Sequence, residues 1–270
     1  MLISAAVVPG PPAFVAELMG SAAHELDDLR AAADVAVARV LSDLIAAGSQ
    51  PPSSFQLVVV GPGQPGELEA SGPVSFAGFG RDVVVPALVE GQPADPALPT
   101  PIMVARYLAS RDLAAHPDHA ELWACARWIT TSGAEALALG EKLAGEPVGV
   151  GLILVADGAA CHGPKAPRAE DVRAQGYDDR VRAALASGQP RRLAELDPHL
   201  GEELGATGAQ IWMVLAAAAG SASPADVAGM AGEEAVGEVL WAGAPYGVGW
   251  VVASWRGPTV GAGETQTNSS

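Results

Sequence analysis

The sequence predicts an α/β fold whose sheet is largely parallel. Residues 152–156 are apolar without interruption and residues 55–60 are apolar except for Gln56, which is typical of strands buried on both faces. Residues 2–8 form a similar apolar segment, and an amphipathic segment separates them from residues 55–60. A strand, a helix and a second strand in this order predict a right-handed parallel crossover. Both strands then end in Gly/Pro turns at the same edge of the sheet.

The segment between these two strands is expected to be a long helix over residues 21–47. Acidic side chains occupy its first turns, apolar side chains form a single stripe, and Gly48 ends it. Thr100 and Pro101 predict a second helix, with Thr100 as the N-cap and Pro101 at the first helical position. The other elements expected in this half are strands at 74–79, 83–88 and 122–129, a Pro-rich loop at 89–99, and the second helix itself over 100–113.

The second half continues this alternation of strands and helices. A capping box at Ser132 and Glu135 predicts a helix that ends near Gly145, just before the central strand at 148–156. Asp197 precedes a proline, which predicts the start of a short helix. The remaining expected elements are helices at 170–187 and 209–219, a short helical piece at Ser223, and a closing pair of strands at 239–242 and 248–255.

Composition and charge argue against several classes of protein. The chain has 270 residues, of which 49% are hydrophobic, so it can bury a large core. Its 15 basic and 31 acidic residues give a net charge of −16, which repels nucleic-acid phosphates and anionic membrane surfaces. Two cysteines without a CxxC pair, and no basic segment before the first apolar one, predict a cytoplasmic protein without a signal peptide. We expect residues 1–256 to form one domain and residues 257–270 a disordered polar tail.

His162 is the first candidate for a functional side chain. It follows the central strand and its Asp157-Gly158 turn, at the sheet edge where ligands bind in open α/β folds. A histidine there can act as a base, a metal ligand or a substrate clamp, or it can be a loop residue that faces water. Asp157 is a candidate to orient it. Lys165 and Arg168, with Arg173 nearby, can either bind an anionic group or pair with Glu170 and Asp171.

Several of these features resemble the class III extradiol ring-cleavage dioxygenases. The resemblance is carried by the element order, the Pro-rich turn after the first strand, the strand-turn-His unit at 152–163, and residues 244–249 (Ala-Pro-Tyr-Gly-Val-Gly). It implies a three-layer α/β sandwich with a mostly parallel mixed sheet. It also implies Fe(II) held by two histidines and one glutamate, with a further histidine as base.

The same resemblance implies that this chain has lost its iron ligands. The turns that carry the two histidines contain Gly10 and Gly63 here, and Gln210 stands at the position of the glutamate. Only the base is matched, by His162. We therefore expect no metal and no cofactor, and a non-catalytic protein that binds a small aromatic or anionic ligand or a partner, with a homodimer as one expected assembly. The alternatives are an enzyme with a rebuilt site around His162, and an iron dioxygenase with other ligands.

Two further histidines are candidates for a different metal site. His116 and His119 flank Asp118, but Pro117 lies between them in a polar segment. This pattern favours a solvated loop over a metal site. His24 and His199 are expected at the surface, and Cys161 as a small packing residue.

Overall fold

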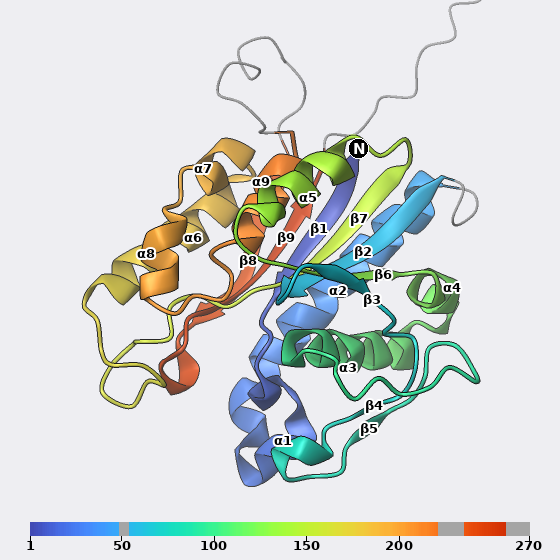
Figure 1. Ribbon diagram of the computed structural model, residues 1–270, viewed down its shortest axis with the longest axis horizontal. Coiled ribbons are helices and arrows are strands. Elements are labelled where there is room, and N and C mark those ends of the chain that lie inside the picture. The colour runs from blue at the N-terminus through green and yellow to red at the C-terminus, as the bar shows by residue number, and fades with distance from the viewer. Residues whose placement is uncertain (49–53, 221–234, 258–270) are drawn as a thin grey trace, which may run out of the picture.

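The computed structural model describes residues 1–48, 54–220 and 235–257, and its centre is a seven-stranded mixed sheet (Figure 1). The strand order is β3-β6-β2-β7-β1-β9-β8. The strands are β1 (Leu2–Val8), β2 (Phe55–Pro62), β3 (Gly66–Leu68), β6 (Arg127–Thr131), β7 (Gly149–Val155), β8 (Val236–Gly243) and β9 (Trp250–Arg256). Neighbouring strands in the run β6, β2, β7 and β1 are parallel, whereas β3, β9 and β8 pair antiparallel at the two sides. The predicted α/β class with a mostly parallel core is confirmed.

Helices cover both faces of this sheet. They are α1 (Ala16–Met19), α2 (Asp27–Ala47), α3 (Thr100–Ala115), α4 (Ala120–Ala124), α5 (Glu135–Ala144), α6 (Arg173–Ser187), α7 (Pro190–Ala194), α8 (Pro198–Glu203) and α9 (Ile211–Ala218). One face packs against α2, α3 and α4, and the other packs against α5, α6 and α9 (Figure 1).

Strand β7 shows why its sequence is apolar throughout. It lies in the middle of the sheet, between β2 and β1. Leu152 and Leu154 belong to the core on the α5, α6 and α9 side, while Ile153 and Val155 belong to the core on the α2 and α3 side. Successive side chains of a strand point to opposite faces, so a strand covered on both faces needs an apolar residue at every position.

The predicted elements around β1 and β7 agree closely with the structure. Strand β1 has the expected bounds, and β1 and β2 both run parallel to β7. The first turns of the long helix differ, because residues Gly20–Leu26 form a 3-10 helix before α2 begins at Asp27. Asp197 caps α8 as expected, since its carboxylate accepts hydrogen bonds from the backbone N–H groups of His199 and Leu200.

Three other predictions need correction. The strand expected at 122–129 is a short helix, α4, followed by β6, because Trp123 turns inward to donate a hydrogen bond to Asp112. The strands expected at 74–79 and 83–88 reduce to the two-residue pair β4 (Val74–Ser75) and β5 (Val84–Val85). The closing strands expected at 239–242 and 248–255 are β8 and β9, but β8 is longer than expected because it begins at Val236, and β9 lies between β1 and β8.

Two helix caps also differ from expectation. Ala134 is the N-cap of α5 and makes no side-chain hydrogen bond, so the capping box at Ser132 does not form. Thr100 is the first residue of α3, and Pro99 is its N-cap. The helical piece expected at Ser223 and nearly all of the expected tail lie outside the described residues. Among the described helices, none combines the length and the apolar character that crossing a membrane requires.

Candidate functional site

His162 forms a close pair with Asp178 near the carboxyl end of β7. The Nε2 atom of His162 lies 2.5 Å from Oδ2 of Asp178, which comes from α6. The other oxygen of Asp178 accepts a hydrogen bond from the backbone N–H of Ala159 at 3.0 Å. The two side chains are 13% and 18% exposed, and burial raises the pKa of Asp178. The carboxylate therefore fixes the orientation of the imidazole at the edge of a partly buried site.

The loop that carries His162 is bound to the loop before β9. The backbone N–H of His162 donates to the carbonyl of Gly247 at 3.0 Å, and Gly158 and Gly249 are joined by a hydrogen bond of 2.7 Å. A Cβ atom at Gly158 or at Gly249 would overlap the carboxylate of Asp178. Glycine at both positions thus lets the two loops close around the His162 and Asp178 pair.

A pocket of about 100 Å³ opens beside this pair. Polar lining comes from His162, Asp178 and, on α6, Gln175, Asp179 and Arg182, while Val251 gives an apolar side. Arg182 is itself bonded to Asp179 at 2.8 Å. The charge left facing the pocket is therefore mainly that of carboxylates, next to an imidazole.

Asp157 lies apart from His162 and does not orient it. Its Oδ1 atom accepts a hydrogen bond from the backbone N–H of Gly10 at 3.0 Å, and its Oδ2 atom accepts one from Thr207 at 3.4 Å. Burial raises the pKa of Asp157 to about 6 despite these two donors. The expected role of Asp157 as orienting residue thus falls to Asp178, which sequence reasoning missed because the polar helix α6 carries two adjacent acids, Asp178 and Asp179, and nothing marks the one that faces His162.

The turns at Gly10 and Gly63 are filled by neighbouring side chains. A Cβ atom at Gly10 would lie 2.7 Å from Cγ1 of Val155 and 3.3 Å from Cβ of Pro101, at the start of α3. A Cβ atom at Gly63 would lie 3.1 Å from Thr130. An imidazole at either position would therefore require its neighbours to move.

Gln210 is bonded to a neighbouring helix. Its amide donates a hydrogen bond to Oε1 of Glu202 at 2.6 Å, in an exposed contact with α8. Of the three positions that the resemblance gives to iron ligands, only Gln210 has a side chain with an oxygen or nitrogen atom.

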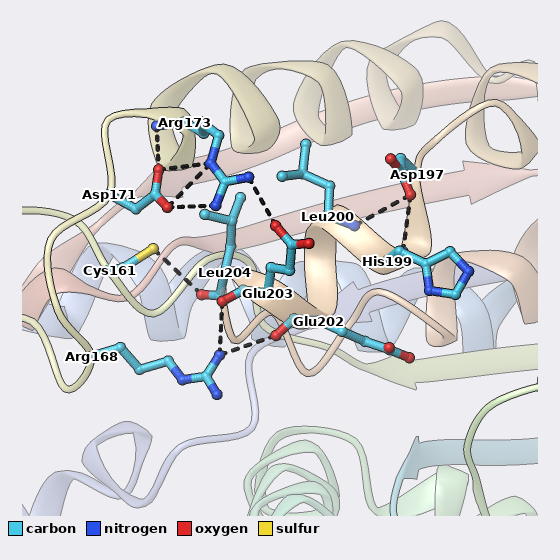
Figure 2. Close-up of polar contacts among 10 residues, drawn as sticks. All are labelled: Cys161, Arg168, Asp171, Arg173, Asp197, His199, Leu200, Glu202, Glu203 and Leu204. Carbon is cyan, nitrogen blue, oxygen red and sulfur yellow. Dashed lines mark hydrogen bonds and ion pairs between the residues drawn. The ribbon is translucent and has the colours of Figure 1, made fainter.

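The basic loop after His162 is bonded to α8 and to its own acids (Figure 2). Arg168 donates to the carbonyl oxygens of Glu202 and Glu203 at 3.0 and 3.1 Å, where a helix C-terminus favours positive charge. Arg173 pairs with Asp171 at 2.7 Å and with Glu203 at 2.8 Å. Of the expected pairing with Glu170 and Asp171, the contact between Arg173 and Asp171 is confirmed, whereas Arg168 bonds α8 instead. Neither these arginines nor the exposed Lys165 lines the pocket.

Cys161 lies buried under the same loop. Its Sγ atom is 3.5 Å from the carbonyl oxygen of Leu204, and burial raises the pKa of its thiol (Figure 2). A thiol with a raised pKa is a poor nucleophile at neutral pH, which agrees with the expected packing role.

The two histidines near the end of α3 are not in a solvated loop. His119 is buried, and both His119 and His116 lie within hydrogen-bonding distance of Asp112 rather than of Asp118. Within the described ranges, Asp112, His116 and His119 form the single group of three potential ligands close enough to share a metal ion. The spacing of Asp112 and His116, four residues apart at the end of a predicted helix, is the signal that sequence analysis overlooked.

No protein-family model matches this sequence, and no curated protein shows significant similarity to it. The resemblance to the extradiol dioxygenases therefore stays a hypothesis.

Proposed function

We propose that this chain is a divergent relative of the extradiol dioxygenases that has lost the iron-dependent reaction and binds a small molecule beside His162 and Asp178. One observation carries this proposal: the His162 and Asp178 pair opens on a pocket, whereas the turns at Gly10 and Gly63 are packed against neighbouring side chains. The position that the resemblance gives to the base thus has its imidazole, while the two turns that the resemblance gives to histidine ligands carry glycine.

The lining of the pocket favours a small phenolic ligand over an anionic one. Nε2 of His162 is bonded to Asp178, so its Nδ1 atom is the nitrogen left to accept a hydrogen bond from a ligand hydroxyl. Val181 and Val251 supply apolar contact for a ring. A ligand carboxylate would meet the charges of Asp178 and Asp179, while the arginine that could offset them already binds Asp179.

A second candidate function follows from the short bond between His162 and Asp178. A carboxylate in this position orients an imidazole and stabilises its protonated form, which is how a histidine serves as a general base. In this alternative His162 removes the proton of a bound hydroxyl group, and the chain is an enzyme with a rebuilt site.

Binding and oxygen uptake separate these possibilities. We expect catechol and phenol to bind the full chain, and His162→Gln to weaken their binding about tenfold or more, because the glutamine amide can replace Nε2 as the donor to Asp178 but places no acceptor at the position of Nδ1. His199→Gln is the matched control, since His199 lies on α8 outside the pocket. Binding that is equal in all three proteins would refute the proposal.

Oxygen uptake with catechol and added Fe(II) tests the loss of the iron reaction. We expect the uptake to equal that of Fe(II) and catechol without protein. Uptake above that background that disappears in His162→Gln would instead show an iron dioxygenase. Chemical conversion of a phenolic ligand without oxygen uptake would favour the second candidate function.

A further inference from the structure

We propose that Asp112, His116 and His119 form a binding site for Zn²⁺ or a closely similar divalent transition-metal ion. This site is separate from the pocket at His162 and does not depend on the function proposed above. Two imidazoles and one carboxylate are a ligand set for first-row transition metals and a poor one for Mg²⁺ or Ca²⁺, which prefer oxygen.

The chain fixes the three side chains within eight residues. Asp112 lies in the last turn of α3, His116 follows the end of α3, and His119 ends the 3-10 helix η4 (Pro117–His119). Backbone hydrogen bonds hold this turn, from His116 N–H to the carbonyl of Asp112 at 2.7 Å and from His119 N–H to the carbonyl of His116 at 3.1 Å. The ligand atoms are therefore positioned by secondary structure before any ion binds.

Two of the three distances in the cluster match those around a tetrahedral ion. Oδ1 of Asp112 lies 3.2 Å from Nδ1 of His116 and 3.2 Å from Nδ1 of His119. Two ligands held 2.0–2.1 Å from one Zn²⁺ are about 3.3–3.4 Å apart at tetrahedral angles and about 2.9 Å apart at right angles. The two observed separations are closer to the tetrahedral value, and all three residues offer ligand atoms within 4.8 Å of one another.

Burial and a supporting hydrogen bond keep the carboxylate in place. The side chain of Asp112 is 2% exposed and that of His119 is 3% exposed. Trp123 Nε1 donates to Oδ2 of Asp112 at 2.8 Å, which leaves Oδ1 for the ion. Nδ1 of His119 also lies 2.9 Å from Oδ2, and this contact gives way when Nδ1 binds metal. Hydrogen bonds of the Trp123 kind orient metal ligands and strengthen binding.

His116 connects the cluster to solvent. Its side chain is 44% exposed and lines a surface hollow with Asp34, Asp43 and Arg39. The ion can enter from this side, and three protein ligands leave a fourth tetrahedral position for water. Metal binding uses the Nδ1 lone pairs, so each neutral imidazole must carry its proton on Nε2 when the ion is bound.

Titration of the metal-free full chain with Co²⁺, followed by Zn²⁺, tests this site. Tetrahedral Co²⁺ absorbs visible light far more strongly than octahedral Co²⁺, so the spectrum reports the geometry as well as the binding. We expect one Co²⁺ per chain with a tetrahedral spectrum, displaced by Zn²⁺. His116→Gln should weaken binding about 100-fold by removing a ligand, while Asp118→Asn, which changes a neighbouring acid outside the cluster, should leave it unchanged.

Other results would overturn the proposal. Absence of binding at millimolar Co²⁺ would mean that the cluster is held by hydrogen bonds alone. Binding that His116→Gln leaves unchanged would place the ion elsewhere, and an octahedral spectrum would exclude the proposed geometry. Because His116 is partly exposed, its replacement should preserve the fold, which circular dichroism checks. If circular dichroism shows that His116→Gln does not keep the fold, ¹⁵N NMR of the wild-type protein replaces this variant as the test. The Nδ1 signals of its imidazoles must then shift when Zn²⁺ is added.

Discussion

The carboxyl edge of the sheet and the corner after α3 both bring histidine and aspartate together, but in different surroundings. At the sheet edge, His162 meets Asp178 from a distant helix, and the pair opens on a pocket. At the corner, Asp112 lies between two imidazoles and an indole and is almost completely buried. The first arrangement joins one imidazole nitrogen to one carboxylate beside a pocket, whereas the second directs several donors at one carboxylate.

This difference shows that the number of converging groups matters more than the residue types. One imidazole and one carboxylate suit hydrogen bonding or proton transfer with a bound molecule. Two imidazoles and one carboxylate suit an ion. Substitutions in the two regions should therefore change the free energy of unfolding by different amounts.

Asp112→Ala should have the largest effect. It removes a buried carboxylate and leaves His119 and Trp123 Nε1 without their partner, so we expect the free energy of unfolding of the metal-free protein to fall by about 3–5 kcal/mol. Urea denaturation measures the loss. Asp118→Ala, at an exposed neighbour, should change stability by less than about 0.5 kcal/mol. Equal losses in the two variants would show that the corner is not a tightly coupled cluster.

Gly10→Ala tests how closely α3 packs against the sheet edge. The added methyl group would lie 2.7 Å from Cγ1 of Val155, so we expect a loss of about 2 kcal/mol in the free energy of unfolding. Gly66→Ala is the matched control, because a Cβ atom there meets nothing within 4 Å. If both variants have the same free energy of unfolding as the wild type, Val155 and α3 leave more space at Gly10 than this contact implies.

Asp178→Ala should cost less than Asp112→Ala. It removes the partner of His162 and the acceptor of the Ala159 N–H, but water can reach this half-buried site and replace part of both bonds. We expect a loss of about 1–2 kcal/mol in urea denaturation. A loss as large as that of Asp112→Ala would show that Asp178 contributes as much to stability as the buried Asp112, which contradicts this comparison.

Asp157→Asn should have the opposite sign, and its effect should depend on pH. Because the pKa of Asp157 is raised to about 6 in the folded state, folding favours its protonated form, and its ionisation lowers stability as pH rises from about 4 to about 6. The amide oxygen of asparagine can still accept from Gly10. A shift of this size corresponds to about 3 kcal/mol, so we expect the variant to gain up to that much relative to the wild type at pH 7 and to be nearly equal to it at pH 4. A difference that does not depend on pH would refute the raised pKa.

The buried strands were predictable because burial on both faces leaves a direct trace in the sequence. Strand β7 and, apart from Ser4, strand β1 are apolar or glycine at consecutive positions, and their short length and the Gly and Pro residues that follow favour strands over helices. The segment with Trp123 and Trp128 is also largely apolar but divides into α4 and β6, where Trp123 donates a hydrogen bond to Asp112. That contact is tertiary, so local sequence does not reveal it.

The candidate site was predictable only at one residue. The position of His162 followed from the end of β7, which is a property of the strand. Its partner Asp178 is one of two adjacent acids on α6, and which of them faces inward depends on how that helix packs against the loops at Gly158 and Gly249. To predict that His116 and His119 meet Asp112, one would have to know where α3 ends to within one helical turn.

The close approach of Pro101 to Gly10 restricts how this scaffold could be redesigned. A histidine introduced at Gly10 would collide with Val155 and with Pro101 in the first turn of α3. These contacts would prevent its imidazole from reaching a metal ion held together with other ligands. The start of α3 would have to be lengthened or shifted first, and only then could a side chain be added. The order of the changes therefore matters, and a library that varies single positions would miss the productive combinations.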